Sequence, residues 1–244
     1  MVRNDNPAGR LYYILFEAKG QNNQLQVKKV WANLFGIEDD NSIEIFEIIS
    51  LLNKLLAEVK RSIADIEGIN KELFLVNFDK ISRVLTLTNL EINWANIVHN
   101  LDDATLLNLA FCSEALSSIK AESLIENTEL QELQELVESL SHAVISTSIN
   151  KDLKNFILSQ LEFIRKAILS YRIQGVDGLK KALEHNIGAL VINKDISTKP
   201  QNKDILEKYS KILEKLEKVI NLASKTKQLI FPVFEKILHL LPQG

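Results

Sequence analysis

At 244 residues, the chain is long enough to form one large domain or two small ones and to bury a sizeable core. Its composition is 46% hydrophobic and 25% charged with only 8 Gly and 4 Pro, which is typical of a folded protein and argues against short strands joined by tight hairpins. The net charge of -3 does not indicate the excess of basic residues that is typical of nucleic-acid-binding proteins. The single Cys excludes an internal disulfide framework.

The first ten residues, MVRNDNPAGR, lack the apolar region of a signal peptide. No window contains 18 consecutive apolar residues, so the sequence predicts no transmembrane span. We therefore expect a cytoplasmic protein.

Apolar residues recur at spacings of three and four along almost the whole chain, which predicts an all-α fold. The stretch VKKVWANLF, residues 27–35, places its apolar side chains on one helical face. The next helix begins with NSIE, a capping box in which Asn41 is the N-cap and Glu44 lies three residues on, and it ends by Gly68.

Polar residues after short gaps mark further helix starts. These predicted starts are Asn70, the region near Asn89, Asp102, Thr128 (TELQ, a second capping box), Asn150 and Asp177. The polar, non-periodic segment NKDISTKPQNK then indicates a boundary. We expect a multi-helix, bundle-like main domain over residues 1–193, a linker over 194–203 and a C-terminal helical hairpin or arm over 204–244.

The stretch from residue 91 to residue 119 holds the only cysteine, and its pattern indicates structural roles. Leu109, Cys112, Leu116 and Ile119 share one face of a helix, so we interpret Cys112 as a small buried hydrophobe. Asp102 precedes that helix, where a carboxylate caps free amides. Trp31 and Trp94 occupy apolar faces as well, and both should be at least half buried.

None of the known catalytic or metal-binding spacings occurs in the sequence. It contains no His-Glu-x-x-His, no Cys-x-x-Cys and no phosphate-binding Gly-x-x-x-x-Gly-Lys-Ser/Thr loop, and its four histidines fall in four different predicted helices. We therefore expect no catalytic residue, no cofactor and no metal.

An acidic strip is the clearest charge feature of the chain. Residues 101–140 carry nine acids and one Lys, with Glu129, Glu132, Glu135 and Glu138 repeating at every third position. Such a strip is either a solvated helix face or a docking surface for a basic partner.

Three stretches, VWANLFGI (30–37), NLAFCSEAL (108–116) and AILSYRIQGVDGLKKALEHNIGAL (167–190), resemble an uncharacterised bacterial all-helical family of unknown function. The resemblance implies a bacterial cytosolic setting, a helix that ends at Gly175 and a second helix capped by Asp177. Gln174 stands where the family pattern has a second Arg.

The same region contains a candidate anion contact. Arg165 and Arg172 are seven residues apart and share a helix face beside the helix start predicted at Asp177, where a carboxylate or phosphate could be received. The alternative is ordinary ion pairing, for which Glu162 is a local partner.

The C-terminal arm contains the best candidate surface for a partner. A coiled-coil seam, with spacings alternating between four and three, runs through Ile205, Tyr209, Ile212, Leu216 and Val219. Lysines make the other face of this helix basic and complementary to the acidic strip, and a final helix is predicted after Pro232. The seam either packs on the main domain of the same chain or binds a protein partner or a second copy.

From these features we expect a non-enzymatic protein-protein interaction or regulatory protein of the bacterial cytoplasm, and a defence or toxin-immunity component would fit this description. One alternative is a membrane-active protein that uses the Lys-rich helix and the following LIFPVFEKILHLL. The other is an enzyme whose scattered carboxylates and histidines converge in the fold. No nucleic-acid partner is expected.

Overall fold

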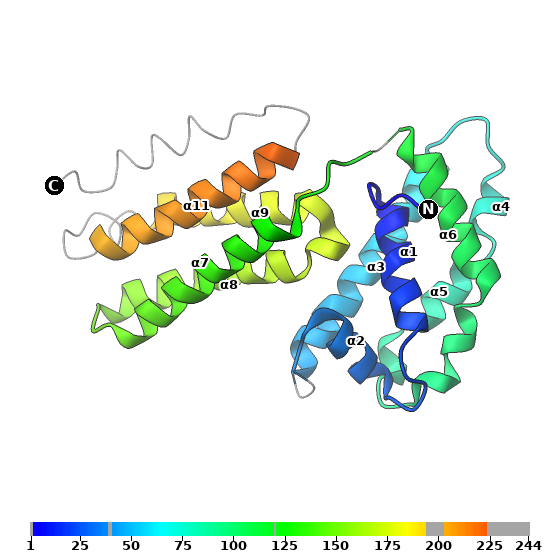
Figure 1. Cartoon of the computed structure of the whole chain (residues 1–244), viewed down its shortest axis with the longest axis horizontal. Helices are drawn as coiled ribbons and strands as arrows, with labels where there is room; N and C mark the ends of the chain where they lie inside the picture. The colour runs from blue at the N-terminus through cyan, green and yellow to red at the C-terminus, as the bar shows by residue number, and fades with distance from the viewer. Residues whose placement is uncertain (1, 39–40, 120, 194–202, 224–244) are drawn as a thin grey trace. The chain divides into compact units, whose positions relative to one another are not determined.

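The computed structural model describes residues 2–38, 41–119, 121–193 and 203–223 (Figure 1). Every regular element in these ranges is a helix, which confirms the all-α fold class. Within the same ranges, no helix is both long enough and apolar enough to cross a membrane. The chain divides into two compact units: unit 1 comprises residues up to 122 together with 172–174, and unit 2 comprises residues 123–171 and those from 175 onward.

Unit 1 is built from helices of unequal length joined by short turns. Its α-helices are α1 (Pro7–Lys19), α2 (Val27–Phe35), α3 (Ser42–Ala64), α4 (Lys71–Leu75), α5 (Phe78–Val84) and α6 (Asp103–Ser117). Three short 3-10 helices, η1 (Leu87–Asn89), η2 (Trp94–Asn96) and η3 (Val98–Asn100), connect α5 to α6. The helix predicted near Asn89 is therefore a series of 3-10 turns.

Local capping explains where several of these helices begin and end. The side chain of Asn41 accepts a hydrogen bond from the Glu44 amide, which confirms Asn41 as the N-cap of α3, and the Glu44 carboxylate accepts from the Asn41 side-chain amide rather than from its backbone N–H as in a capping box. Gly36 ends α2 in the left-handed conformation, with a φ of 64°, which Gly adopts at little cost.

Two tryptophans form the centre of the unit 1 core. Trp31 from α2 and Trp94 from η2 are both fully buried, as predicted, and their rings meet edge to face at 5.9 Å. An isolated bridge between Gln26 and Asn93 and the hydrogen bond from the Trp94 amide to the Leu25 carbonyl (2.7 Å) hold the two segments together. The core therefore joins residues about sixty positions apart in the sequence.

In its described residues, unit 2 contains four long helices: α7 (Asn127–Ser146), α8 (Lys151–Leu169), α9 (Tyr171–Ile192) and α11 (Lys203–Ala223). Gly175 interrupts α9 with a φ of 59° and a ψ of -154°, values open only to Gly, so the break predicted at this position is present. The predicted cap Asn150 starts α8 by accepting from the Asp152 and Leu153 amides. The second capping box is wrong, because α7 begins at Asn127 with Glu126 as N-cap and no side-chain cap.

The apolar stripes of these helices face one another and form the core of unit 2. α7 packs against both α8 and α11. Leu133, Val137, Leu140 and Val144 of α7 are each at most 3% exposed. Their four-three-four spacing explains why α7 buries a narrow stripe and exposes most of its remaining surface.

The predicted division of the chain differs from the observed one. The units separate near residue 122, and the described part of the predicted arm, residues 204–223, belongs to unit 2 with α7, α8 and α9. The physical reason is that α11 covers apolar residues of α7 and α9 that would otherwise face water. Residues 194–202 of the predicted linker and residues 224–244, including the helix predicted after Pro232, lie outside the described residues.

Candidate binding groove

A groove lies between α7 and α8 on the surface of unit 2. Its volume is about 310 Å³, near the lower end of the range of roughly 300–1,000 Å³ found for ligand pockets. It is lined by nine side chains: Val137, Glu138, Ser141, His142 and Ile145 from α7, and Leu158, Leu161, Glu162 and Arg165 from α8. We call this feature the α7–α8 groove.

The floor of the groove is apolar. Val137 and Leu161 belong to the buried core stripes of their helices, and Leu158 packs against the same core. At one end of the groove, Ile145 is 58% exposed. The accessible apolar surface of the groove is therefore provided mainly by Ile145 and partly by Leu158, above the almost fully buried Val137 and Leu161.

The rim is polar and carries charges of both signs. The Arg165 guanidinium donates two hydrogen bonds to Glu162, from Nε (2.8 Å) and from Nη2 (2.9 Å), and these bonds lower the pKa of Glu162 below its usual range. Glu138 accepts from the neutral amide of Gln134 at 2.8 Å. Of the two carboxylates in the groove, Glu162 is thus matched by a cation, whereas Glu138 is hydrogen-bonded to a neutral group.

The groove brings together the residue types of a hydrolytic site without the contacts that such a site requires. The Ser141 hydroxyl donates to the Val137 carbonyl of its own helix at 2.8 Å, so its proton is not directed toward His142. Glu162 is held ionised by Arg165 and is not poised as a proton donor near neutral pH. Among the described residues, no group of three or more His, Cys, Asp or Glu side chains is placed to hold a metal ion.

The coiled-coil seam predicted to bind a partner lies in the core of unit 2. Ile205, Tyr209, Ile212, Leu216 and Val219 are between 0% and 7% exposed. The Tyr209 hydroxyl donates to Asn186 Oδ1 of α9 at 2.6 Å, and burial raises the pKa of Tyr209. Of the two alternatives that the sequence left open for the seam, packing within the same chain is therefore the one observed for these residues, so the seam itself is not open to a partner.

The acidic strip is divided between two sides of α7. Lys215 of α11 pairs with Glu129 (2.6 Å) and Glu132 (2.5 Å), whereas Glu135 and Glu138 are exposed beyond this contact. Each step of three residues falls about 60° short of a full helical turn, so Glu129 and Glu138 lie on opposite sides of the helix. The expected attraction between the strip and the basic arm is present at Glu129 and Glu132, within one chain.

Lys215 and Glu129 shift each other's pKa in the expected directions. Hydrogen bonds from Lys215 lower the pKa of Glu129, and Glu129 and Glu132 together raise the pKa of Lys215. Both effects favour the charged forms, so the pair is ionised near neutral pH.

The two arginines of the predicted anion contact have protein partners. Arg165 lies in unit 2 and pairs with Glu162, the local partner named from the sequence. Arg172 is grouped with unit 1, where it pairs with Glu17 at 2.6 Å and lies over the Phe35 ring. A shared anion site is therefore not supported, because each guanidinium is paired with a carboxylate in a different unit.

The residues singled out around the cysteine have the structural roles that were predicted. Cys112 is fully buried, its thiol faces the Phe74 carbonyl at 3.5 Å, and burial raises its pKa to about 12. Asp102 caps α6 by accepting from Thr105, and the hydrogen bond from Lys80 is the main cause that lowers its pKa to about 2. Ile119 does not share the buried face, because α6 ends at Ser117 and Ile119 is 60% exposed.

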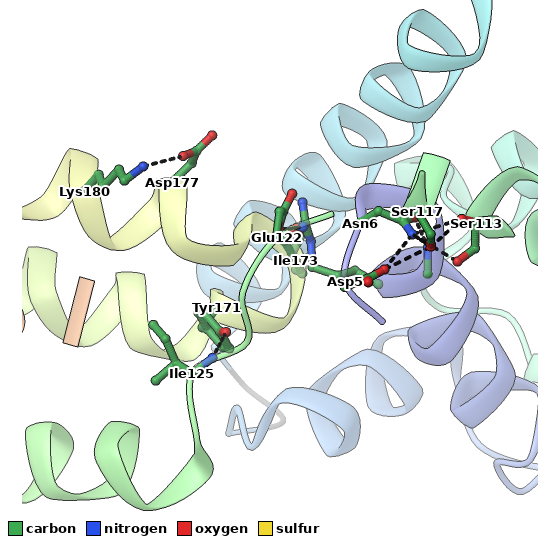
Figure 2. A network of polar contacts seen from close by, with 12 residues as sticks. Asp5, Asn6, Ser113, Ser117, Glu122, Ile125, Tyr171, Ile173, Asp177 and Lys180 are labelled. Carbon is green, nitrogen blue, oxygen red and sulfur yellow. Dashed lines mark hydrogen bonds and ion pairs between the residues drawn. The ribbon is translucent and has the colours of Figure 1, made fainter. Parts of the chain in front are cut away.

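Sequence reasoning missed a buried polar network in unit 1. Figure 2 shows the Asn6 side chain between Asp5 and the two serines of α6. The Asn6 amide donates to the Ser113 carbonyl (3.0 Å) and to Ser117 Oγ (2.8 Å), while its oxygen caps α1 by accepting from the Gly9 amide (3.0 Å). The available signal was the pair Asn6–Pro7, an N-cap residue followed by Pro in the first turn.

A buried arginine lies one turn further along α1. Arg10 is 5% exposed, its Nε donates to the Ile173 carbonyl at 3.1 Å, and its guanidinium pairs with Glu122. The structure assigns Ile173 and Glu122 to unit 1 with Arg10. These contacts hold the segment that follows α6 against α1.

The sequence did not predict the α7–α8 groove, although Glu138, Glu162 and Arg165 from its lining were named for other reasons. Ile145 and Leu158 could have been noticed as large apolar residues that fall outside the main stripes of their helices. No protein-family model, no curated protein and no solved structure matches this chain.

Proposed function

We propose that this chain is a non-enzymatic protein-interaction protein of the bacterial cytoplasm and that it binds its partner through the α7–α8 groove. The observation that carries the proposal is a concave surface with an apolar floor, an exposed Ile145 and a polar rim. Apolar grooves between helices accept the apolar face of a partner helix, with polar groups at the edge setting its position. The bacterial setting rests on the resemblance of three sequence stretches to an all-helical bacterial family.

The contacts in unit 2 favour this function over the two alternatives. An enzymatic role would need an activated group in the groove, but the Ser141 hydroxyl is bonded to its own helix and Glu162 is bonded to Arg165. A membrane-active role was predicted for α11 together with the following LIFPVFEKILHLL; the apolar seam of α11 is packed inside unit 2 and does not face outward, whereas LIFPVFEKILHLL lies outside the described residues.

The proposal is tested by placing the photo-crosslinking residue p-benzoylphenylalanine at position 145 in cells that naturally express the chain. We expect one crosslinked protein on illumination, because position 145 lies at the open end of the groove. The matched control carries the same residue at Ile192, which is 82% exposed at the end of α9 and does not line the groove.

A second variant tests whether the groove itself is used. Leu158→Asp places a charge against the apolar floor and should abolish the adduct at position 145. Because Leu158 also packs against the core of unit 2, far-UV circular dichroism is recorded on the same variant, and loss of the adduct supports the proposal only where the helical signal is retained. The proposal fails if position 145 gives no adduct, if position 192 gives the same one, or if the adduct survives Leu158→Asp.

A further inference from the structure

The charges around the α7–α8 groove are unevenly matched. Glu162 is neutralised by the two hydrogen bonds from Arg165. Glu138 receives only the neutral Gln134 amide, and Glu135 lies exposed one turn earlier on α7. Within the part of the chain that the structure describes, neither Glu135 nor Glu138 forms an ion pair, so this end of the groove carries uncompensated negative charge.

The opposite end of the groove differs in charge. There the Lys154 ammonium donates to the Ile145 carbonyl at 2.6 Å, close to the C-terminal end of α7. This lysine satisfies a backbone acceptor of the last helical turn and adds a positive charge beside Ile145. The groove is therefore acidic at the Glu138 end and apolar, with a basic neighbour, at the Ile145 end.

From this polarity we infer that the α7–α8 groove binds an amphipathic helix of a partner protein that carries a Lys or Arg at the Glu138 end and large aliphatic residues along the floor. The inference rests on the proposed interaction function and specifies the chemistry of the partner. Seven residues separate Glu138 from Ile145, which corresponds to roughly 10 Å along a helix. A matching partner helix would place its basic residue about two turns from its outermost apolar residue, with a further apolar residue between them.

The length and shape of the groove support a helix as the occupant. Two rows of side chains line the groove. The α7 row has a residue at every fourth position: Val137, Ser141 and Ile145. The α8 row has spacings of three and then four residues: Leu158, Leu161 and Arg165. Side chains of a third helix at matching spacings can fit between these two rows. An uncompensated carboxylate at one end fixes the direction of that helix, since like charges placed opposite one another are strongly unfavourable.

The test uses a yeast-displayed library of 16-residue helical peptides, selected against the purified full chain. The peptides are randomised at four positions with the spacing i, i+3, i+4 and i+7. We expect the selected peptides to carry Lys or Arg at one outer position and Leu, Ile, Val or Phe at the others. Against the Glu138→Lys variant they should bind at least about 10-fold more weakly, and a fresh selection should favour Asp or Glu at the same position.

The matched control is Glu184→Lys, which makes the same charge change at an exposed position of α9 outside the groove. The selected peptides should bind this variant within about twofold of the unchanged chain, as expected for a surface substitution away from the site. Selected peptides without a basic preference, or peptides that bind Glu138→Lys as well as the unchanged chain, would overturn the inference.

The remaining outcomes separate this inference from the function on which it rests. An adduct at position 145 together with charge-independent peptide selection refutes the basic helix and leaves the interaction function in place. If position 145 gives no adduct and the selected peptides show no basic preference, both the interaction function and the basic partner helix are refuted. Self-association of the purified chain that is abolished by Ile145→Asp, measured by sedimentation velocity, would assign the groove to a second copy and also overturn the inference.

Discussion

In unit 1, the amide of Asn6 joins segments 107 residues apart through hydrogen bonds to Ser113 and Ser117, and Arg10 is buried one turn away. In unit 2, the helices meet mainly through aliphatic stripes, and the buried Tyr209–Asn186 hydrogen bond links α11 to α9. Unit 1 therefore adds directional polar contacts between distant segments to its apolar core, whereas regular spacing of apolar residues brings the helices of unit 2 together.

The comparison can be tested because the two units carry different probes. Both tryptophans and the only cysteine lie in unit 1, so tryptophan fluorescence and thiol labelling report on that unit alone. The long helices of unit 2 contribute strongly to far-UV circular dichroism. Changes in one unit should therefore alter one set of signals more than the other.

The largest effect is expected from ending the chain after residue 199, which removes α11. Burial of each large apolar side chain is worth roughly 1.5–3 kcal/mol, so losing the seam takes away an amount comparable to the whole net stability of a domain, about 5–15 kcal/mol. We expect unit 2 to lose its cooperative urea transition in circular dichroism while the tryptophan transition of unit 1 remains. A chain ending after residue 223 keeps α11 and is the control; equal loss in both truncations would contradict the role given to α11.

The second effect is expected at Asn6 and concerns unit 1. Asn6→Ala removes the cap of α1 and leaves buried acceptors of α6 without a donor, which should lower the free energy of unfolding by about 2–4 kcal/mol. Urea unfolding followed by tryptophan fluorescence measures this change. Asn70→Ala is the control, because Asn70 precedes α4 without a side-chain cap bond and should change stability by less than about 0.5 kcal/mol.

A smaller effect is expected at the buried polar contact of unit 2. Tyr209→Phe leaves the Asn186 oxygen without its donor and should cost about 1–2 kcal/mol in the circular dichroism transition, with the tryptophan signal unaffected. The double variant Tyr209→Phe, Asn186→Leu should lose less than the sum of the two single variants, since it removes both partners. Strictly additive losses would show that the hydrogen bond itself contributes nothing.

Acid should affect unit 1 through Asp102. Its pKa is about 2 in the folded chain against an ordinary value of 3.8, so the carboxylate adds stability above pH 3.8 that is lost as the pH falls toward 2. The tryptophan-monitored difference in stability between the unchanged chain and Asp102→Asn should therefore shrink across this pH window. A difference that stays constant from about pH 5 to pH 2 would contradict this assignment.

The smallest effect is expected at the surface contact between α11 and α7. Lys215→Gln removes the cation between Glu129 and Glu132 and should lower the melting temperature of unit 2 slightly at low salt. The loss should shrink near 1 M salt, where the screening length falls to roughly 3 Å, close to the separation of the paired charges. A salt-independent loss would mean that the aliphatic part of Lys215 stabilises the contact instead.

The sequence by itself determined the helical class, several helix starts and the burial of specific residues. Asn41, Asp102 and Asn150 were recognisable as caps because capping depends on neighbours three residues away. Cys112 and both tryptophans were recognisable as core residues because helical periodicity is a local property. The same periodicity located the apolar seam of α11.

Only the tertiary structure decided which surfaces meet. A stripe such as the α11 seam needs an apolar partner, but its spacing is equally compatible with the same chain, a second copy or another protein. The Asn6 network depends on side chains from distant segments, and the α7–α8 groove depends on the packing of two helices whose outer residues show no shared pattern. A local stretch of sequence does not specify which distant segment it will contact. The reason is that burial of apolar surface is non-directional, so an apolar stripe is stabilised by any apolar surface that covers it.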